Sequence, residues 1–230
     1  MCPSAEQLLG QLALNDRVVP IAFHIDYFND PWKDPFSDAK FSRRESQYSV
    51  IYDRENKLNN PSYLYLTPLV MIDGRFPMLG TDDAKAGKAM PKAKDAVRRA
   101  LAEKPGVSLG LTLKTPRQGN ERTLEVAVTP LIPELRGRDV LIAVIPFSAS
   151  TTTRVASGEL KGKTYTGRFV ARGLNIQSAT LTRSGKTLVT IPVTLPKDAD
   201  LSRDGLVVIA QDEATGKVYQ AATIRWAEKK

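Results

Sequence analysis

The spacing of apolar and polar positions changes near the middle of the chain. Before residue 104 it predicts three helices and three short strands, with helices at about 4–15, 41–52 and 82–103 and strands at 18–28, 69–73 and 76–79. Beyond that point, apolar and polar residues alternate in short segments separated by Gly, Pro, Asn or Asp, which is typical of strands. Lys104-Pro105-Gly106 marks the change, so we predict one domain over residues 1–104 and a second over residues 105–230.

Several local signals refine the first half. Ser4 followed by Gln7 matches a capping box and predicts the start of the first helix. Asp73-Gly74, between two apolar runs, predicts an antiparallel hairpin. Thr81 is expected to cap the third helix, which Pro91 should kink or divide. Helices mixed with strands predict an α/β domain, in which residues 18–26 form part of the sheet.

The second half shows no comparable helical signal. Seven or eight short strands separated by turns indicate an all-β, sandwich-like domain. The whole chain is therefore expected to be an α/β domain followed by a β-sandwich.

Composition and charge exclude several classes of function. With 230 residues, 42% hydrophobic and 25% charged, the chain resembles an ordinary globular protein. The net charge of +8 is scattered rather than gathered in a dense basic run, so no nucleic-acid partner is expected. No apolar stretch is long enough to span a membrane. A single cysteine excludes an internal disulfide, and neither a cofactor motif nor a metal-ligand cluster is present, so no cofactor and no metal are expected.

The candidate chemistry lies at Cys2. A cysteine just before a helix gains thiolate stability from the helix dipole and from the free N–H groups of the first turn. Thr67 and Pro68 open a later apolar run, and a cysteine faced by such a proline is how thioredoxin-like folds build a thiol site. We therefore assign the catalytic thiol to Cys2 and backbone pairing with substrate to Thr67 and Pro68. The alternative is that Cys2 is a buried, inert apolar residue.

Three further residues are candidate neighbours of the thiol. His24 and Asp26 are two apart on a predicted strand, so their side chains should share a face. His24 could then move protons or ligate a metal, or it could simply pack with a buried hydrogen bond. Trp32 could line a substrate groove or anchor a loop against the core.

A longer pattern points to a known family. Residues 23–36 (FHIDYFNDPWKDPF), with residues 2–5 (CPSA) and 66–75 (LTPLVMIDGR), resemble a family of secreted bacterial thioredoxin-like proteins catalogued only as a domain of unknown function. The similarity covers most of residues 1–103 and continues weakly beyond them. Phe28 departs from it, because the family has tryptophan there.

The resemblance implies a specific fold and an earlier start of the natural protein. It implies a thioredoxin-like domain whose first strand is missing, with Cys2 as the second cysteine of a C-x-x-C motif. The natural protein is then expected to start before Met1, with a signal peptide, a strand and the first cysteine. It would be periplasmic or secreted, whereas a genuine start at Met1 would leave it in the cytoplasm.

Two functions follow from these expectations. The first is a thiol–disulfide oxidoreductase-like protein of the bacterial envelope acting on protein thiols, disulfides or glutathione. Its cycle cannot be completed within this form, because only the second cysteine remains. The alternative is a non-catalytic binding or scaffold module whose β-sandwich holds a protein or ligand partner.

Overall fold

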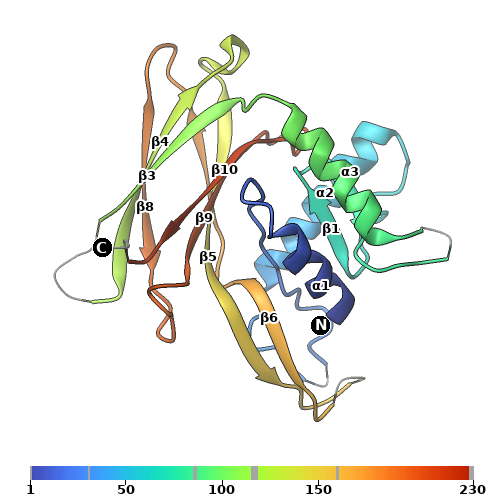
Figure 1. The fold of residues 1–230 in the computed structure, drawn as a ribbon. Coiled ribbons are helices and arrows are strands. Elements are labelled where there is room, and N and C mark those ends of the chain that lie inside the picture. The colour runs from blue at the N-terminus through green and yellow to red at the C-terminus, as the bar shows by residue number, and fades with distance from the viewer. Residues whose placement is uncertain (1, 31, 85–86, 115–118, 159–160, 228–230) are drawn as a thin grey trace. The chain divides into compact units, whose positions relative to one another are not determined.

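The chain forms two compact units. The computed structural model describes residues 2–30, 32–84, 87–114, 119–158 and 161–227 (Figure 1). Unit 1 comprises Met1–Glu103, Ser150–Val170 and Ala214–Lys217, and unit 2 comprises Lys104–Ala149, Ala171–Glu213 and Val218–Lys230.

The described residues up to Glu103 in unit 1 form three helices and a hairpin. The elements are α1 (Pro3–Leu12), α2 (Ala39–Asn56), β1 (Leu69–Ile72), β2 (Phe76–Leu79) and α3 (Ala89–Ala102). The predicted hairpin is confirmed, because β1 and β2 pair antiparallel with Leu69 opposite Leu79. In its loop, Asp73 and Gly74 have φ values of 54° and 68°, a left-handed conformation that these two residue types tolerate.

Two helix starts differ from the predictions. The residue that caps α1 is Cys2 rather than Ser4, and its side chain makes no capping hydrogen bond. Helix α3 begins at Ala89, whose N–H donates to Asp82 Oδ1 at 2.8 Å. Pro91 therefore falls in the first turn, where no intrahelical hydrogen bond needs its missing N–H, and it does not divide the helix.

A small apolar core joins the helices of unit 1 to the hairpin. Leu8 and Leu12 of α1 pack with Ala89 and Ala93 of α3, and these four buried residues contact partly buried side chains of β1 and β2. Helix α2 begins after the capping residue Asp38, whose side chain accepts a hydrogen bond from the Lys40 N–H.

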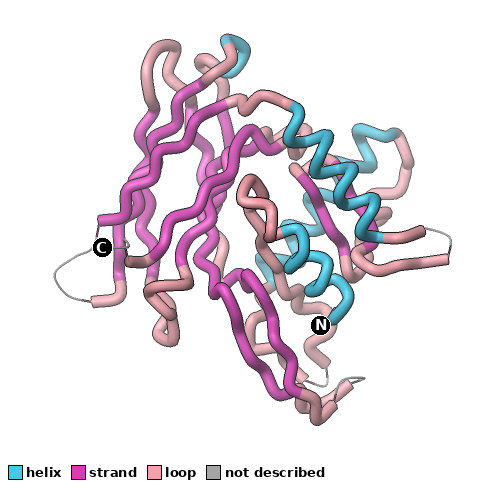
Figure 2. The backbone as a smooth tube through the Cα atoms, viewed as in Figure 1, coloured by secondary structure: helices cyan, strands magenta, loops and turns pink. Residues whose placement is uncertain are grey.

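The α/β thioredoxin-like fold predicted for residues 1–104 is wrong. Within the described residues, the 18–28 segment forms only isolated bridges, from Ala22 to Val170 and from His24 to Ser37. Pro20 has no N–H to donate, and the Ala22 N–H bonds singly to the Phe169 carbonyl instead of joining a ladder. Strands dominate the regular structure instead (Figure 2), and they form three antiparallel sheets.

The remaining strands extend along the second half of the chain. They are β3 (Val107–Lys114), β4 (Glu121–Pro130), β5 (Asp139–Arg154), β6 (Thr164–Ala171), β7 (Asn175–Thr180), β8 (Thr187–Thr194), β9 (Gly205–Gln211) and β10 (Val218–Arg225), with a short 3₁₀ helix at Pro133–Leu135. One sheet has the order β3-β4-β8. The other has the order β10-β9-β5-β6, with β7 also paired to β5.

The core of unit 2 contains side chains from both of these sheets. Burial alternates along β4, where Leu124, Val126 and Val128 are fully buried. These residues share one apolar cluster with Ile142 of β5 and Leu206 of β9. The period of two in the sequence thus reflects strands that each turn one face to a common interior.

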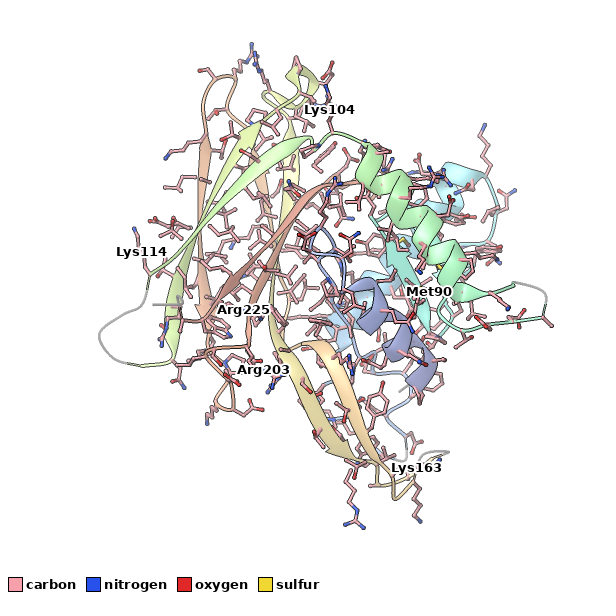
Figure 3. All side chains as sticks on the ribbon, in the orientation of Figure 1. Met90, Lys104, Lys114, Lys163, Arg203 and Arg225 are labelled. Carbon is pink, nitrogen blue, oxygen red and sulfur yellow. The ribbon has the colours of Figure 1, made fainter. Side chains whose placement is uncertain are left out.

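The end of β5 and most of β6 belong to unit 1. They form a hairpin in which the Val155 N–H donates to the carbonyl of Lys163, a residue labelled in Figure 3. This hairpin carries Tyr165 and Gly167. Segment 214–217 also joins unit 1, where Lys217 pairs with Glu103 at 2.7 Å.

Candidate functional site

Cys2 is a free, partly exposed cysteine at the N-terminal end of α1. Its backbone is extended, with φ −124° and ψ 96°, and its carbonyl accepts the Glu6 N–H at 3.1 Å. Pro3 occupies the first helical position, where a fixed φ favours helix initiation. The local sequence therefore places the thiol beside the unpaired N–H groups of a helix start.

A buried tyrosine from the β5–β6 hairpin lies near this thiol. Tyr165 is 9% exposed, and its hydroxyl bonds to the Glu6 carboxylate. Burial and the charge of Glu6 raise the pKa of Tyr165 well above its ordinary value, and Cys2 and Asp34 add to the effect. The other function of Glu6 is structural, because its Oε2 accepts the Arg168 backbone N–H at 2.9 Å.

His24 is hydrogen-bonded to Asp34 next to the same hairpin. Its Nδ1 lies 2.8 Å from Asp34 Oδ2, and the two side chains are only 10% and 15% exposed. Burial acts to raise the pKa of Asp34, but the hydrogen bond and charge of His24 hold it below the ordinary value. A Cβ built on Gly167 would lie 3.9 Å from His24 Cε1, so the imidazole lies against β6.

Asp26 and Trp32 occupy other surroundings. Residues 24–26, all of which the structure describes, do not form a strand that would align His24 with Asp26, and the two side chains take different partners. Asp26 accepts the Ser42 hydroxyl, while its own N–H donates to Ser42 Oγ at 3.0 Å. Trp32 is partly exposed in the loop that leads to Asp34.

Pro68 lies near the first turn of α1, and Thr67 precedes it. Their peptide bond is cis, and the Pro68 carbonyl accepts the Gly80 N–H at 2.8 Å. A Cβ on Gly80 would lie 3.3 Å from that carbonyl and 3.2 Å from the Cβ of Ala5. The structure thus brings Pro68 close to the helix turn that Cys2 caps, with Thr67 exposed beside it.

Tyr27 and Glu45 are two further residues of this site that the sequence analysis did not single out. The Tyr27 hydroxyl bonds both to Thr67 Oγ1 and to the carboxyl group of Glu45. Burial, opposed by the Thr67 hydrogen bond and reinforced by Glu45, raises the pKa of Tyr27 to about 12. Burial also raises the pKa of Glu45 to about 7, although hydrogen bonds from Tyr27 and the Leu66 N–H act against it.

A sequence signal for Glu45 did exist. Phe41, Glu45 and Ser49 follow one another at intervals of four and are 2%, 9% and 1% exposed. A carboxylate that follows Phe41 at helical spacing on the buried face of α2 is unusual enough to mark a site. Tyr165 had no such signal, because more than 160 residues separate it from Cys2.

Comparison with models of known protein families gives a match over most of the chain. Residues 1–211 match the model described as "Protein of unknown function (DUF1223)". The chain belongs to this family. This confirms the resemblance to an uncharacterised domain family, whose description names no activity. The search of curated proteins found no match to this DUF1223 chain.

One solved structure is similar over part of the chain. It is HBP35 of Porphyromonas gingivalis, with a TM-score of 0.47 and 7% identity over 61% of this chain and 47% of that one. The DUF1223 chain therefore spans about half the length of that protein.

Two further features of the described residues concern membranes and metals. None of their helices combines the length and apolar character that a membrane crossing requires. Their His, Cys, Asp and Glu side chains form no group of three placed to hold a metal ion.

Glu6 carries the carboxylate nearest to Cys2 along α1, and we expect it to slow the reaction of the Cys2 sulfur with alkylating agents. Glu6 lies one turn from Cys2, and its negative charge opposes the anionic thiolate that reacts with alkylating agents. We expect Glu6→Gln to raise the rate of Cys2 alkylation by iodoacetamide at pH 7 about threefold. Glu55→Gln, which changes an exposed carboxylate on α2, is the matched control. Equal rates in the two variants would show that Glu6 has no influence on the sulfur.

Proposed function

We propose that this protein takes part in thiol–disulfide exchange through Cys2, with protein disulfides or glutathione as the reaction partner. The observation that carries the proposal is the position of Cys2, a free and partly exposed cysteine at a helix N-terminus. Helix N-terminal N–H groups favour the thiolate, which is the attacking species. The proposal concerns this chemistry and does not depend on the overall fold.

The proposed exchange needs one cysteine and an external thiol. The Cys2 thiolate attacks one sulfur of a disulfide, forming a new S–S bond and releasing the other sulfur as a thiolate. A second external thiolate then attacks the mixed disulfide and releases Cys2. Each step forms one S–S bond and breaks another, so the protein undergoes no net oxidation.

The surroundings suggest how a substrate would be held. The Pro68 carbonyl accepts the Gly80 N–H, while Thr67, two residues before β1, is exposed. We propose that the Thr67 backbone pairs with an extended substrate segment, as strands add to an open edge. The His24–Asp34 pair would border this segment. Residence in the bacterial envelope is part of the proposal and rests on the resemblance of residues 2–75.

Glutathione disulfide provides the direct test. We expect the protein to form a mixed disulfide at Cys2, visible by mass spectrometry, and to lose it when a dithiol is added. The rate should exceed that of a peptide of residues 1–12 by roughly tenfold, because only the folded chain supplies the helix start. Cys2→Ser should form no adduct. A protein rate equal to the peptide rate would contradict the proposal and favour the binding or scaffold module.

A further inference from the structure

A cavity lies between helices α1 and α3 of unit 1, both labelled in Figure 1. Its volume is about 520 Å³, and small-molecule ligand sites commonly measure ~300–1,000 Å³. One wall is the end of α1 with the turn that follows it, within residues 11–18, and the other is the second half of α3, within residues 94–102. The described residues that line the cavity all belong to unit 1, and they do not include Cys2.

The least exposed residues that line this cavity are apolar. Leu12 is 8% exposed, and Val18 and Val97 pack against the small core to which Leu12 belongs. The lining positions of α3 are 94, 97, 98, 101 and 102, a spacing that places them on one face of the helix. An apolar ligand that covers these side chains removes them from water, which is favourable.

The charged side chains among the described lining residues are all positive. Arg17, Lys94 and Arg98 are present, whereas no Asp or Glu occurs in this described lining. The Arg17 Nη2 donates to the Leu101 carbonyl at 3.1 Å, so its guanidinium is held at the C-terminal end of α3. Arg98 pairs with Asp95 at 2.7 Å, but these side chains are 73% and 54% exposed, and such a pair is weak. The cavity therefore offers positive charge to an anion.

The secondary structure of the walls favours a small molecule over a peptide. Residues 11–18 and 94–102, all described, are helix and turn, so they present no strand edge to an extended chain. A peptide backbone laid on their apolar side chains would leave polar groups without hydrogen-bond partners, which is costly. A hydrocarbon chain has no such groups.

We propose that this cavity binds a free fatty acid, a single hydrocarbon chain that ends in a carboxylate. The chain covers the apolar side chains of Leu12 and Val97, and the carboxylate pairs with Lys94 and Arg98. Arg17 is already fixed by its own hydrogen bond, so little side-chain freedom is lost there when the ligand binds. The inference is independent of the proposed thiol exchange, because the two sites share no residue.

Titration calorimetry with dodecanoate, kept below the concentration at which it forms micelles, provides the test. We expect one site per chain with a Kd on the order of 10 μM. Dodecyltrimethylammonium has the same chain with the opposite charge, and acetate has the same charge without the chain. Both should bind at least about tenfold more weakly than dodecanoate.

Variants of exposed residues locate the site. Lys94→Gln combined with Arg98→Gln should weaken dodecanoate binding about tenfold and leave dodecyltrimethylammonium binding no weaker, a contrast that general loss of structure would not produce. Lys40→Gln combined with Arg43→Gln removes two exposed charges from α2 and is the matched control. Gln11→Trp, at an exposed lining position, should reduce dodecanoate binding by filling the cavity.

Three outcomes would overturn the inference: no binding of dodecanoate, equal affinity for the two detergent-like ions, or equal dodecanoate affinity in the two double variants. Binding of an acidic helical peptide in place of dodecanoate would likewise replace the fatty acid as occupant. Cys2→Ser should bind dodecanoate as the wild type does. Failure of thiol exchange therefore leaves this inference standing, and failure of dodecanoate binding leaves the exchange proposal standing.

Discussion

Glu45→Gln should make the protein more stable than the wild type above pH 7, by about 3 kcal/mol. Burial raises the pKa of Glu45 to about 7 from 4.5, so the folded state binds more protons than the unfolded state between these values. The stability of the wild type should therefore fall as the pH rises from 4.5 to 7. It should then stay at the lower level, since the folded protein must keep a charged carboxylate buried.

Denaturant unfolding between pH 4 and pH 8.5 measures this difference. Glutamine keeps the shape of the side chain without its charge, so the free energy of unfolding of the variant should lack this fall with pH. Glu55→Gln is the control, because its side chain on the same helix is 49% exposed and should follow the wild-type curve. Parallel curves for Glu45→Gln and the wild type would show that Glu45 binds no extra proton on folding.

Gly205→Ala should destabilise the protein by about 3 kcal/mol or more. A Cβ at this position would lie 2.2 Å from the Ile224 carbonyl oxygen and 3.0 Å from the Arg225 Cα. Gly205 begins β9 and pairs with Arg225 on one side and with Phe147 on the other. Backbone atoms cannot rotate away as a side chain does, so the start of the β9–β10 ladder would have to separate.

A second glycine in a strand gives the matched comparison. A Cβ on Gly110 in β3 would lie 3.5 Å from the Ala127 Cβ, an ordinary contact. Gly110→Ala should therefore change the free energy of unfolding by less than about 1 kcal/mol. The denaturation midpoints of both variants test the difference. Equal losses of unfolding free energy in the two variants would mean that the Cβ added at position 205 is accommodated without separating β9 from β10.

Local patterns predicted elements whose hydrogen bonds are formed within a short stretch of chain. The hairpin at residues 69–79 and the helix over residues 41–52 were recognisable because the donor and acceptor of each backbone hydrogen bond lie a few residues apart in the sequence. Details that depend on capping were less accurate. Ser4 matched a capping box, but Pro3 starts the helix one residue earlier and makes Cys2 the capping residue.

The 18–28 segment shows where local patterns mislead. Its apolar composition favours a strand, but a strand also needs a neighbour that accepts a ladder of hydrogen bonds. In the structure, the Ala22 N–H instead finds a single carbonyl from β6, nearly 150 residues later. The α/β class inferred from this segment was therefore wrong, although its amino acids are compatible with extended backbone.

The sequence by itself determined the hairpin, the helices and the alternating strands of the second half, because each depends on the spacing of neighbouring side chains. It also identified Cys2, Thr67 and Pro68 as candidates for one site. Only the tertiary structure brought Tyr165 to Glu6 and joined Glu45 to Thr67 through Tyr27. Those contacts depend on which distant segments pack together, and burial, which alters the chemistry of Glu45, exists only after that packing.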